Sequence, residues 1–225
     1  MKSSQNPWDI LGKRVIDPTA ADNILIAWPV ILKLILKYFP ESKNIKALDF
    51  GCGTGAFCTK IDQMGYSTTG IDPSVEMIKV AKANSFKSIR YILGDKSKLP
   101  DKYKFQIITS IMALPFIEDL EETIHSLTDH LKPKGIMIFA DFNREWVNEC
   151  LKKNQVFSDG YINFGDIKVK TYIRNAKDYE KIAGKFKLKK IIEEYPPFTQ
   201  NFIENYPDKR PKNIPEYMIL GYKKN

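Results

Sequence analysis

Three glycines alternate at positions 51, 53 and 55, directly after the apolar segment 47–50 and before a segment with helical apolar spacing. A glycine-rich turn between a buried strand and a helix lets the backbone approach a nucleotide-like ligand and offers free amides at the helix start. Gly51, Gly53 and Ala56 also fit the dinucleotide fingerprint, in which pyrophosphate lies at the helix N-terminus. The glycine turn could therefore bind either the pyrophosphate of a dinucleotide or a positively charged nucleotide-like ligand. The carboxylate of Asp49 favours the second, because at this place it repels pyrophosphate and attracts an ammonium or sulfonium group.

Two further aspartates follow the next two expected strands. Asp72 comes 21 residues after Gly51, where an acid reaches the ribose hydroxyls of an adenosine ligand. Asp95 follows the strand expected at 89–93 and suits an adenine amino group. A lone Asp at such a place is more often a helix N-cap or a turn former. Three acids at the carboxyl ends of successive strands instead indicate one ligand site.

Read in order, these segments resemble the class I S-adenosylmethionine-dependent methyltransferases, and in particular the branch that includes the ubiquinone- and menaquinone-type small-molecule enzymes. The resemblance covers roughly residues 45 to 141. It rests on Leu48-Asp49-Phe50-Gly51-Cys52-Gly53-Thr54-Gly55, on segment 70–77, on Gly94-Asp95, and on segments 105–110 and 131–135. It implies a seven-stranded, mostly parallel sheet with an antiparallel hairpin at one edge.

The resemblance also implies S-adenosylmethionine as cofactor and S-adenosylhomocysteine as product. Asp49 and the glycines would line the methionine end, Asp72 would hold the ribose, and Asp95 with the Lys96 amide would read the adenine. The full predicted cofactor set is Trp8, Asp49, Gly51, Cys52, Gly53, Thr54, Gly55, Asp72, Pro73, Met77, Asp95, Lys96 and Ser110. No metal ion is expected, since Cys52 and Cys58 lack partner histidines.

The loop after the fourth expected strand departs from the nucleic-acid enzymes of this class. The nucleic-acid amino-methyltransferases of the class carry Asn/Asp-Pro-Pro-Tyr/Phe, whereas this chain has only Pro115-Phe116 in an apolar loop. We therefore predict in-line methyl transfer to an N, O or C nucleophile of a small molecule. An RNA methyltransferase, a non-catalytic S-adenosylmethionine-binding protein and a dehydrogenase stay as alternatives.

Residues expected at the rim of the sheet supply the remaining candidates. A base helps only if the nucleophile is a hydroxyl or a protonated amine. The predicted catalytic residues are Asp141, Tyr172 and Arg174, and the predicted substrate-binding residues are Arg14, Trp28, Met112 and Phe116. Arg174 suits a carboxylate or another anionic group on the acceptor.

The net charge of +8 is a weak sign of nucleic-acid binding. Of 35 basic residues only five are Arg, and Lys is the residue that an AT-rich genome favours. Because Arg is the preferred residue for bidentate phosphate contacts, the composition argues against a nucleic-acid partner. It leaves the oligomeric state open.

Alternating strand and helix patterns predict an α/β fold, a doubly wound sheet in one domain spanning residues 1–225. We expect a helical lid at 1–40, a cofactor-binding core at 45–141, and a substrate cap with closing strands at 142–214. Strands are expected at 47–50, 67–71, 89–93, 105–110 and 136–140, with further strands at 167–173, 188–193 and 217–222. Apolar stripes should bury Ile24, Trp28, Ile31 and Ile35 on the opening helix, and Val75, Ile78 and Ala81 on a later one.

Three cysteines are too few for a disulfide framework, and their odd number suits a reducing compartment. The first residues lack the apolar core of a signal peptide. The most apolar stretch, 24–36, is shorter than the roughly 20 residues that span a bilayer. These features predict a cytoplasmic protein without a membrane partner.

Overall fold

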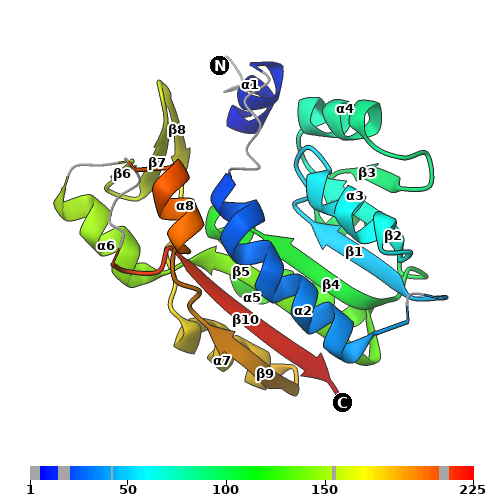
Figure 1. The fold of residues 1–225 in the computed structure, drawn as a ribbon. Coiled ribbons are helices and arrows are strands. Elements are labelled where there is room, and N and C mark those ends of the chain that lie inside the picture. The colour runs from blue at the N-terminus through cyan, green and yellow to red at the C-terminus, as the bar shows by residue number, and fades with distance from the viewer. Residues whose placement is uncertain (1–5, 15–20, 42, 154–155, 208–212) are drawn as a thin grey trace.

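A seven-stranded sheet forms the centre of the protein (Figure 1), seen in a computed structural model that describes residues 6–14, 21–41, 43–153, 156–207 and 213–225. The strand order is β3-β2-β1-β4-β5-β10-β9. Only β10 runs antiparallel to its two neighbours, β5 and β9. The strands are β1 (Lys46–Phe50), β2 (Ser67–Asp72), β3 (Arg90–Leu93), β4 (Phe105–Ile111), β5 (Leu131–Phe142), β9 (Leu188–Glu194) and β10 (Tyr217–Lys224). The predicted α/β class, the seven strands and the antiparallel edge are confirmed.

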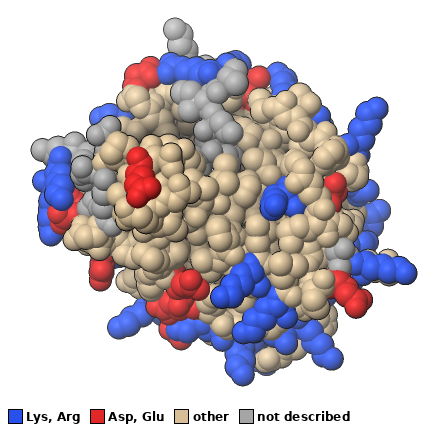
Figure 2. Space-filling view, viewed as in Figure 1, with Lys and Arg blue, Asp and Glu red and all other residues tan. Residues whose placement is uncertain are grey.

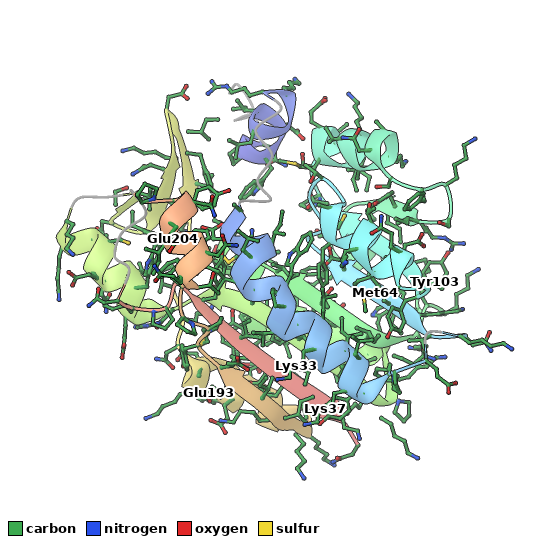
Figure 3. All side chains as sticks on the ribbon, in the orientation of Figure 1. Lys33, Lys37, Met64, Tyr103, Glu193 and Glu204 are labelled. Carbon is green, nitrogen blue, oxygen red and sulfur yellow. The ribbon has the colours of Figure 1, made fainter. Side chains whose placement is uncertain are left out.

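Helices cover both faces of this sheet because each has one apolar side. On one face lie α2 (Trp28–Tyr38) and α3 (Ala56–Gln63); on the other lie α5 (Leu120–His130) and α7 (Ala176–Lys185). On α2, Ile31, Leu34 and Ile35 are buried, whereas Lys33 and Lys37 lie on its exposed side (Figure 3). Side chains cap the helix starts: Asp119 accepts a hydrogen bond from the Glu122 amide at 2.8 Å, and the Ser74 side chain, which precedes α4 (Val75–Asn84), accepts one from the Met77 amide.

The cap beyond β5 contains a second, three-stranded antiparallel sheet, β6 (Phe157–Ser158), β7 (Tyr161–Phe164) and β8 (Ile167–Lys170). It lies beside α6 (Arg144–Lys152) and α8 (Gln200–Asn205), while α1 (Pro7–Lys13) lies over the ends of the central strands (Figure 1). The strand expected at 167–173 ends at Lys170, because the chain then turns to the loop after β4: the Tyr172 amide donates to the Pro115 carbonyl at 2.7 Å.

Two predicted apolar stripes are partly wrong. Ile24 is 42% exposed because residues Asn23–Ala27 form a π-helical turn, whose longer repeat rotates Ile24 away from the stripe of α2. Val75 is also 42% exposed, since it lies in the first turn of α4, and burial begins at Met77. Within the described residues, no helix is long and apolar enough to cross a bilayer.

Candidate active site

A cavity of about 380 Å³ lies at the carboxyl ends of β1, β2, β4 and β5. This is the edge of an α/β sheet where ligands bind. Its lining combines the glycine turn after β1, the turn after β2, the loop after β4, the start of β10 and the cap strands. The cavity therefore has a glycine-rich end over β1 and β2 and a second end beside β5 and β10.

The glycine turn after β1 depends on left-handed backbone. Gly51 has φ +75°, and a Cβ there would lie 2.2 Å from the Ala113 Cβ. The amides of Gly51 and Cys52 both donate to the Ile71 carbonyl, at 2.8 and 3.1 Å, which joins the turn to β2. Any larger residue at Gly51 would separate this turn from the loop after β4.

Asp49 is a buried carboxyl at the end of β1, 3% exposed, and it lines the cavity. It accepts a hydrogen bond from Thr109 Oγ1 at 2.8 Å and one from Cys58 Sγ at 3.7 Å. Burial raises the pKa of Asp49 to about 6, and the charge of Asp72 adds to this effect. A bound cation would favour the charged form.

Asp72 ends β2 and holds the two turns together. Its Oδ2 accepts from the Gly53 amide at 3.0 Å, and its Oδ1 accepts from the Ser74 amide at 2.9 Å. Burial raises the pKa of Asp72 above its usual value. Each oxygen keeps a further lone pair for a ligand hydroxyl. The structure also brings Cys52, Thr54, Pro73 and Met77 of the predicted cofactor set to the cavity wall.

Four other predicted cofactor residues are not brought to this wall. Gly55 packs against Tyr91: a Cβ there would lie 2.3 Å from its hydroxyl. Asp95 is exposed and caps a short helix through the Ser97 amide at 2.8 Å. Lys96 Nζ pairs with Glu122 at 2.8 Å, and Ser110 is fully buried on the strand interior. The structure thus shows turn and packing contacts for the side chains at positions 55, 95 and 96, and the Ser110 Oγ is buried without a hydrogen-bond partner among the described residues. The cofactor contacts predicted for these four residues stay predictions.

Helix α1 brings Trp8 to the cavity. The Trp8 ring packs edge-on against Phe116, with ring centroids 4.7 Å apart, and against Phe164 at 5.8 Å. Asp9 fixes the helix to α4, since its Oδ1 accepts from Ser74 Oγ at 2.6 Å. Gly12 permits this close approach, because a Cβ there would lie 2.9 Å from the Glu76 Cβ.

The predicted substrate-binding residues divide between the cavity and the surface. Trp28, Met112 and Phe116 line the cavity, and Met112 has φ +56° in the loop after β4. Arg14 does not: its guanidinium pairs with Asp166 through two bonds, at 2.5 and 3.0 Å, on the surface. The expectation that Arg14 contacts the substrate is corrected, because this pair ties α1 to the turn between β7 and β8.

The three predicted catalytic residues also lie away from the cavity. Asp141 points to the opposite face of the sheet, where it accepts a hydrogen bond from Tyr179. Tyr172 packs with Lys170 and Arg174. Arg174 donates to the carbonyls of Leu114, Ile117 and Glu118, so it fixes the loop after β4. None of the three lines the described cavity. The position of a residue at the end of a strand does not by itself predict to which face of the sheet its side chain points.

Arg174 is expected to matter for stability through that loop. Arg174→Ala should lower the free energy of unfolding by about 2 kcal/mol or more, because three carbonyls lose a charged donor. Arg144→Ala is the matched control: its guanidinium bonds the Ile173 carbonyl at 2.7 Å from an exposed position, so a loss below about 1 kcal/mol is expected. Chemical denaturation measures both; equal losses would contradict the anchoring role.

Asp141 should make stability depend on pH. Burial raises the pKa of Asp141 to about 7, so the folded protein holds a proton that the unfolded chain has released above about pH 4. The free energy of unfolding should therefore fall as pH rises from about 4 to 7, by at most about 1.4 kcal/mol per pH unit from this group. Asp141→Asn should flatten that part of the pH profile; an unchanged profile would contradict the assignment.

Sequence reasoning missed the residues at the far end of the cavity. They come from the segment before α2, from the end of β5, from α6, from the cap and from the start of β10. These lining residues are Asp22, Asn23, Phe142, Trp146, Val156, Phe157, Ile162, Asn163, Phe164, Glu216 and Tyr217. No motif marks them, because their meeting depends on β10 lying next to β5: Tyr217 is paired with Phe142.

Comparisons with known proteins agree with this fold. A family model described as a methyltransferase domain matches residues 27–189, and the chain belongs to that family. Among solved structures, an S-adenosylmethionine-dependent methyltransferase from Mesorhizobium loti superposes with a TM-score of 0.70 at 20% identity, covering 91% of this chain and 98% of the other. The prediction of such a methyltransferase is confirmed at the level of family and fold.

Two curated relatives are similar to this chain in sequence. The chain is 36% identical over 105 residues to a ubiquinone biosynthesis O-methyltransferase of Pelagibacter ubique, covering 45% of this chain and 44% of the relative. It is 30% identical over 153 residues to the enzyme of that name from Bartonella bacilliformis, covering 66% and 58%. The chain thus spans about half the length of the curated relatives it matches.

Proposed function

We propose that this protein transfers a methyl group from S-adenosylmethionine to a small-molecule acceptor by in-line displacement. The observation that carries the proposal is one continuous cavity with two unlike ends. Asp49 and Asp72 lie beside the glycine turn at one end, and aromatic side chains form the walls of the other. A donor and an acceptor bound side by side need such a shape.

The residues present fit the cofactor. Asp49 offers a buried carboxylate to a positive group, and Asp72 offers acceptors to hydroxyls. Gly53 lines the cavity at φ +51°, and a Cβ there would meet no described atom within 4 Å, so backbone is open to a ligand at this point. When bound, S-adenosylmethionine supplies an activated methyl group on a positively charged sulfur.

The chain's own contribution is positioning and the exclusion of water. Trp8 on α1, with Phe116 and Phe164, covers the cavity from the cap side. The buried aromatic walls keep water from the reacting groups and fix the acceptor close to the methyl group. In this proposal α1 acts as the lid.

Gly53→Ala should weaken binding of S-adenosylhomocysteine about tenfold or more, because the added methyl group occupies ligand space. Gly160→Ala is a matched control: φ there is +71°, and a Cβ would also meet no described atom within 4 Å, but Gly160 does not line the cavity. Both variants carry similar backbone strain, so their thermal stabilities should fall alike. Equal affinities in calorimetry would contradict the placement of the ligand.

A small-molecule acceptor is favoured over RNA. The loop after β4 lines the cavity with the apolar Ile111, Met112 and Phe116. On the face drawn in Figure 2, Lys and Arg side chains gather at the lower edge and lie in small separate groups elsewhere, and they form no continuous basic track across the face. The names of the curated relatives support the same class.

Calorimetry with S-adenosylmethionine, S-adenosylhomocysteine and NADH tests the proposal. We expect the first two to bind and NADH not to bind; binding of NADH alone would favour a dehydrogenase. Release of S-adenosylhomocysteine in a metabolite extract then separates an enzyme from a protein that only binds the cofactor. Saturable methylation of bulk RNA, with steeply salt-dependent binding, would overturn the small-molecule class.

A further inference from the structure

Two of the three cysteines, Cys52 and Cys58, lie together beside the glycine turn. A Cβ at Gly70 of β2 would lie 2.8 Å from each of their sulfurs, so the two sulfurs are no more than twice that distance apart. Each thiol also alters the pKa of the other. Cys150, on α6, belongs to a different core cluster. All three are free thiols, and Cys52 and Cys58 are the two that are neighbours.

The local fold explains why these two sulfurs converge. The Gly55 amide donates to the Cys52 carbonyl at 2.9 Å, and this turn leads the chain back into α3, where Cys58 is the third residue. Gly70 has no side chain, so it leaves room for both sulfurs against β2. The pair is therefore held together by the same turn that lines the cavity.

The two thiols differ in their access to small molecules. Cys52 lines the cavity and is 7% exposed, whereas Cys58 is fully buried. Cys58 Sγ donates a hydrogen bond to Asp49 Oδ2 at 3.7 Å, so it contacts the proposed cofactor site from the interior. A small oxidant in the cavity therefore reaches Cys52 first, and Cys58 is placed to react with Cys52.

Both thiols are protonated at neutral pH. The neighbouring Cys58 thiol lowers the pKa of Cys52, but burial and the charges of two aspartates outweigh this effect and leave that pKa above its usual value. Burial raises the pKa of Cys58 well above its usual value. Because the thiolate is the form that reacts with oxidants, the pair reacts slowly and responds to sustained oxidation.

We propose that Cys52 and Cys58 are a redox-sensitive pair, which a hydroperoxide converts into a disulfide that weakens cofactor binding. Formation of the disulfide is independent of the proposed function, whereas its effect on the cofactor rests on that function. Two thiols and one hydroperoxide take part in the reaction.

The oxidation proceeds in two steps. With hydrogen peroxide, the Cys52 sulfur attacks one oxygen and the O–O bond breaks; the departing hydroxide takes the thiol proton as water, which leaves a sulfenic acid on Cys52. The Cys58 sulfur then attacks the Cys52 sulfur, the S–O bond breaks, and the hydroxide released takes the Cys58 proton as a second water. Asp49 is in place to carry that proton, because it already accepts the Cys58 hydrogen bond. The two thiols are oxidised and the peroxide is reduced.

The disulfide should disturb the cofactor end of the cavity. A disulfide joins its sulfurs at about 2.05 Å, so Cys52 must approach Cys58 from its present contact and pull the glycine turn toward α3. Asp49 would also lose the Cys58 hydrogen bond, which lowers its pKa and thereby favours the charged carboxylate. Both changes oppose the binding of a positively charged cofactor.

Mass spectrometry and calorimetry on the full chain test the proposal. Hydrogen peroxide should remove two hydrogen atoms from the chain, and peptide mapping should join Cys52 to Cys58. The oxidised chain should bind S-adenosylhomocysteine about tenfold more weakly, and dithiothreitol should restore the affinity. Oxidation products confined to single cysteines, or equal affinities of the oxidised and reduced chains, overturn the proposal. A reduced chain that fails to bind S-adenosylhomocysteine refutes the proposed function, and with it the effect on binding, whatever the mass shows.

Variants and the redox equilibrium assign the effect to this pair. Cys58→Ser keeps a hydroxyl donor for Asp49 and should form no internal bond, whereas Cys150→Ser removes another fully buried thiol and should still form the disulfide. Because coupling is reciprocal, saturating S-adenosylhomocysteine should favour the thiol form about tenfold, which raises the midpoint potential by ~30 mV in dithiothreitol redox buffers. A disulfide that persists in Cys58→Ser, or a potential that the ligand leaves unchanged, counts against the proposal.

Discussion

Asp72→Ala is expected to weaken S-adenosylmethionine binding roughly 10- to 150-fold. The carboxylate is placed to accept hydroxyl hydrogen bonds from the ligand, and a lost charge-assisted hydrogen bond is worth about 1.5 to 3 kcal/mol. It also orders the site before binding, since its two oxygens hold the Gly53 and Ser74 amides at 3.0 and 2.9 Å. Calorimetry at pH 7.5 measures the loss.

Two other aspartates serve as comparisons for Asp72→Ala. Asp119 caps α5 through the Glu122 amide and lies outside the cavity wall, so Asp119→Ala removes a similar backbone contact and should leave affinity unchanged. Asp95 is exposed, and the resemblance implies that it contacts the adenine. Asp95→Ala tests that contact. Equal affinities of the Asp72→Ala and Asp119→Ala proteins would refute the ribose assignment.

Affinity for S-adenosylmethionine should fall about tenfold for each pH unit below about 6 and be constant above about 7. The sign follows from Asp49, whose pKa burial raises to about 6. A cationic ligand binds the charged carboxylate, so at lower pH binding must first remove a proton. Calorimetry between pH 5 and 8 measures the slope. The raised pKa acts on stability in the opposite sense, because protonated Asp49 favours the folded chain at low pH.

Asp49→Asn identifies the group responsible for that slope. The variant keeps the side-chain shape beside Thr109, but it has no charge to titrate. Its affinity should be lower at pH 7.5 and independent of pH from 5 to 8. A slope that persists in the variant would assign the titration to another group, with Asp72 as the first candidate, because burial raises its pKa too.

The end of the cavity at the glycine turn was predictable, because its residues lie within a few positions of the ends of β1 and β2. Gly51 and Gly53 follow β1 directly, and Asp49 and Asp72 end neighbouring parallel strands. Parallel pairing places the carboxyl ends of such strands at one edge of the sheet. Asp95 shows where this argument stops: it also follows a strand, but β3 is the edge strand and Asp95 is exposed there.

The sequence by itself determined the sheet, the helices on its two faces and the acidic glycine turn, because periodicity and turn chemistry act over a few residues. Only the tertiary structure decided the acceptor end of the cavity. Phe142 and Tyr217 lie far apart in the chain and meet because β10 pairs with β5. The same long-range packing directs Asp141 to the opposite face of the sheet and Arg174 to the carbonyls of the loop after β4. Which face of a strand is buried against which partner is a property of the assembled sheet.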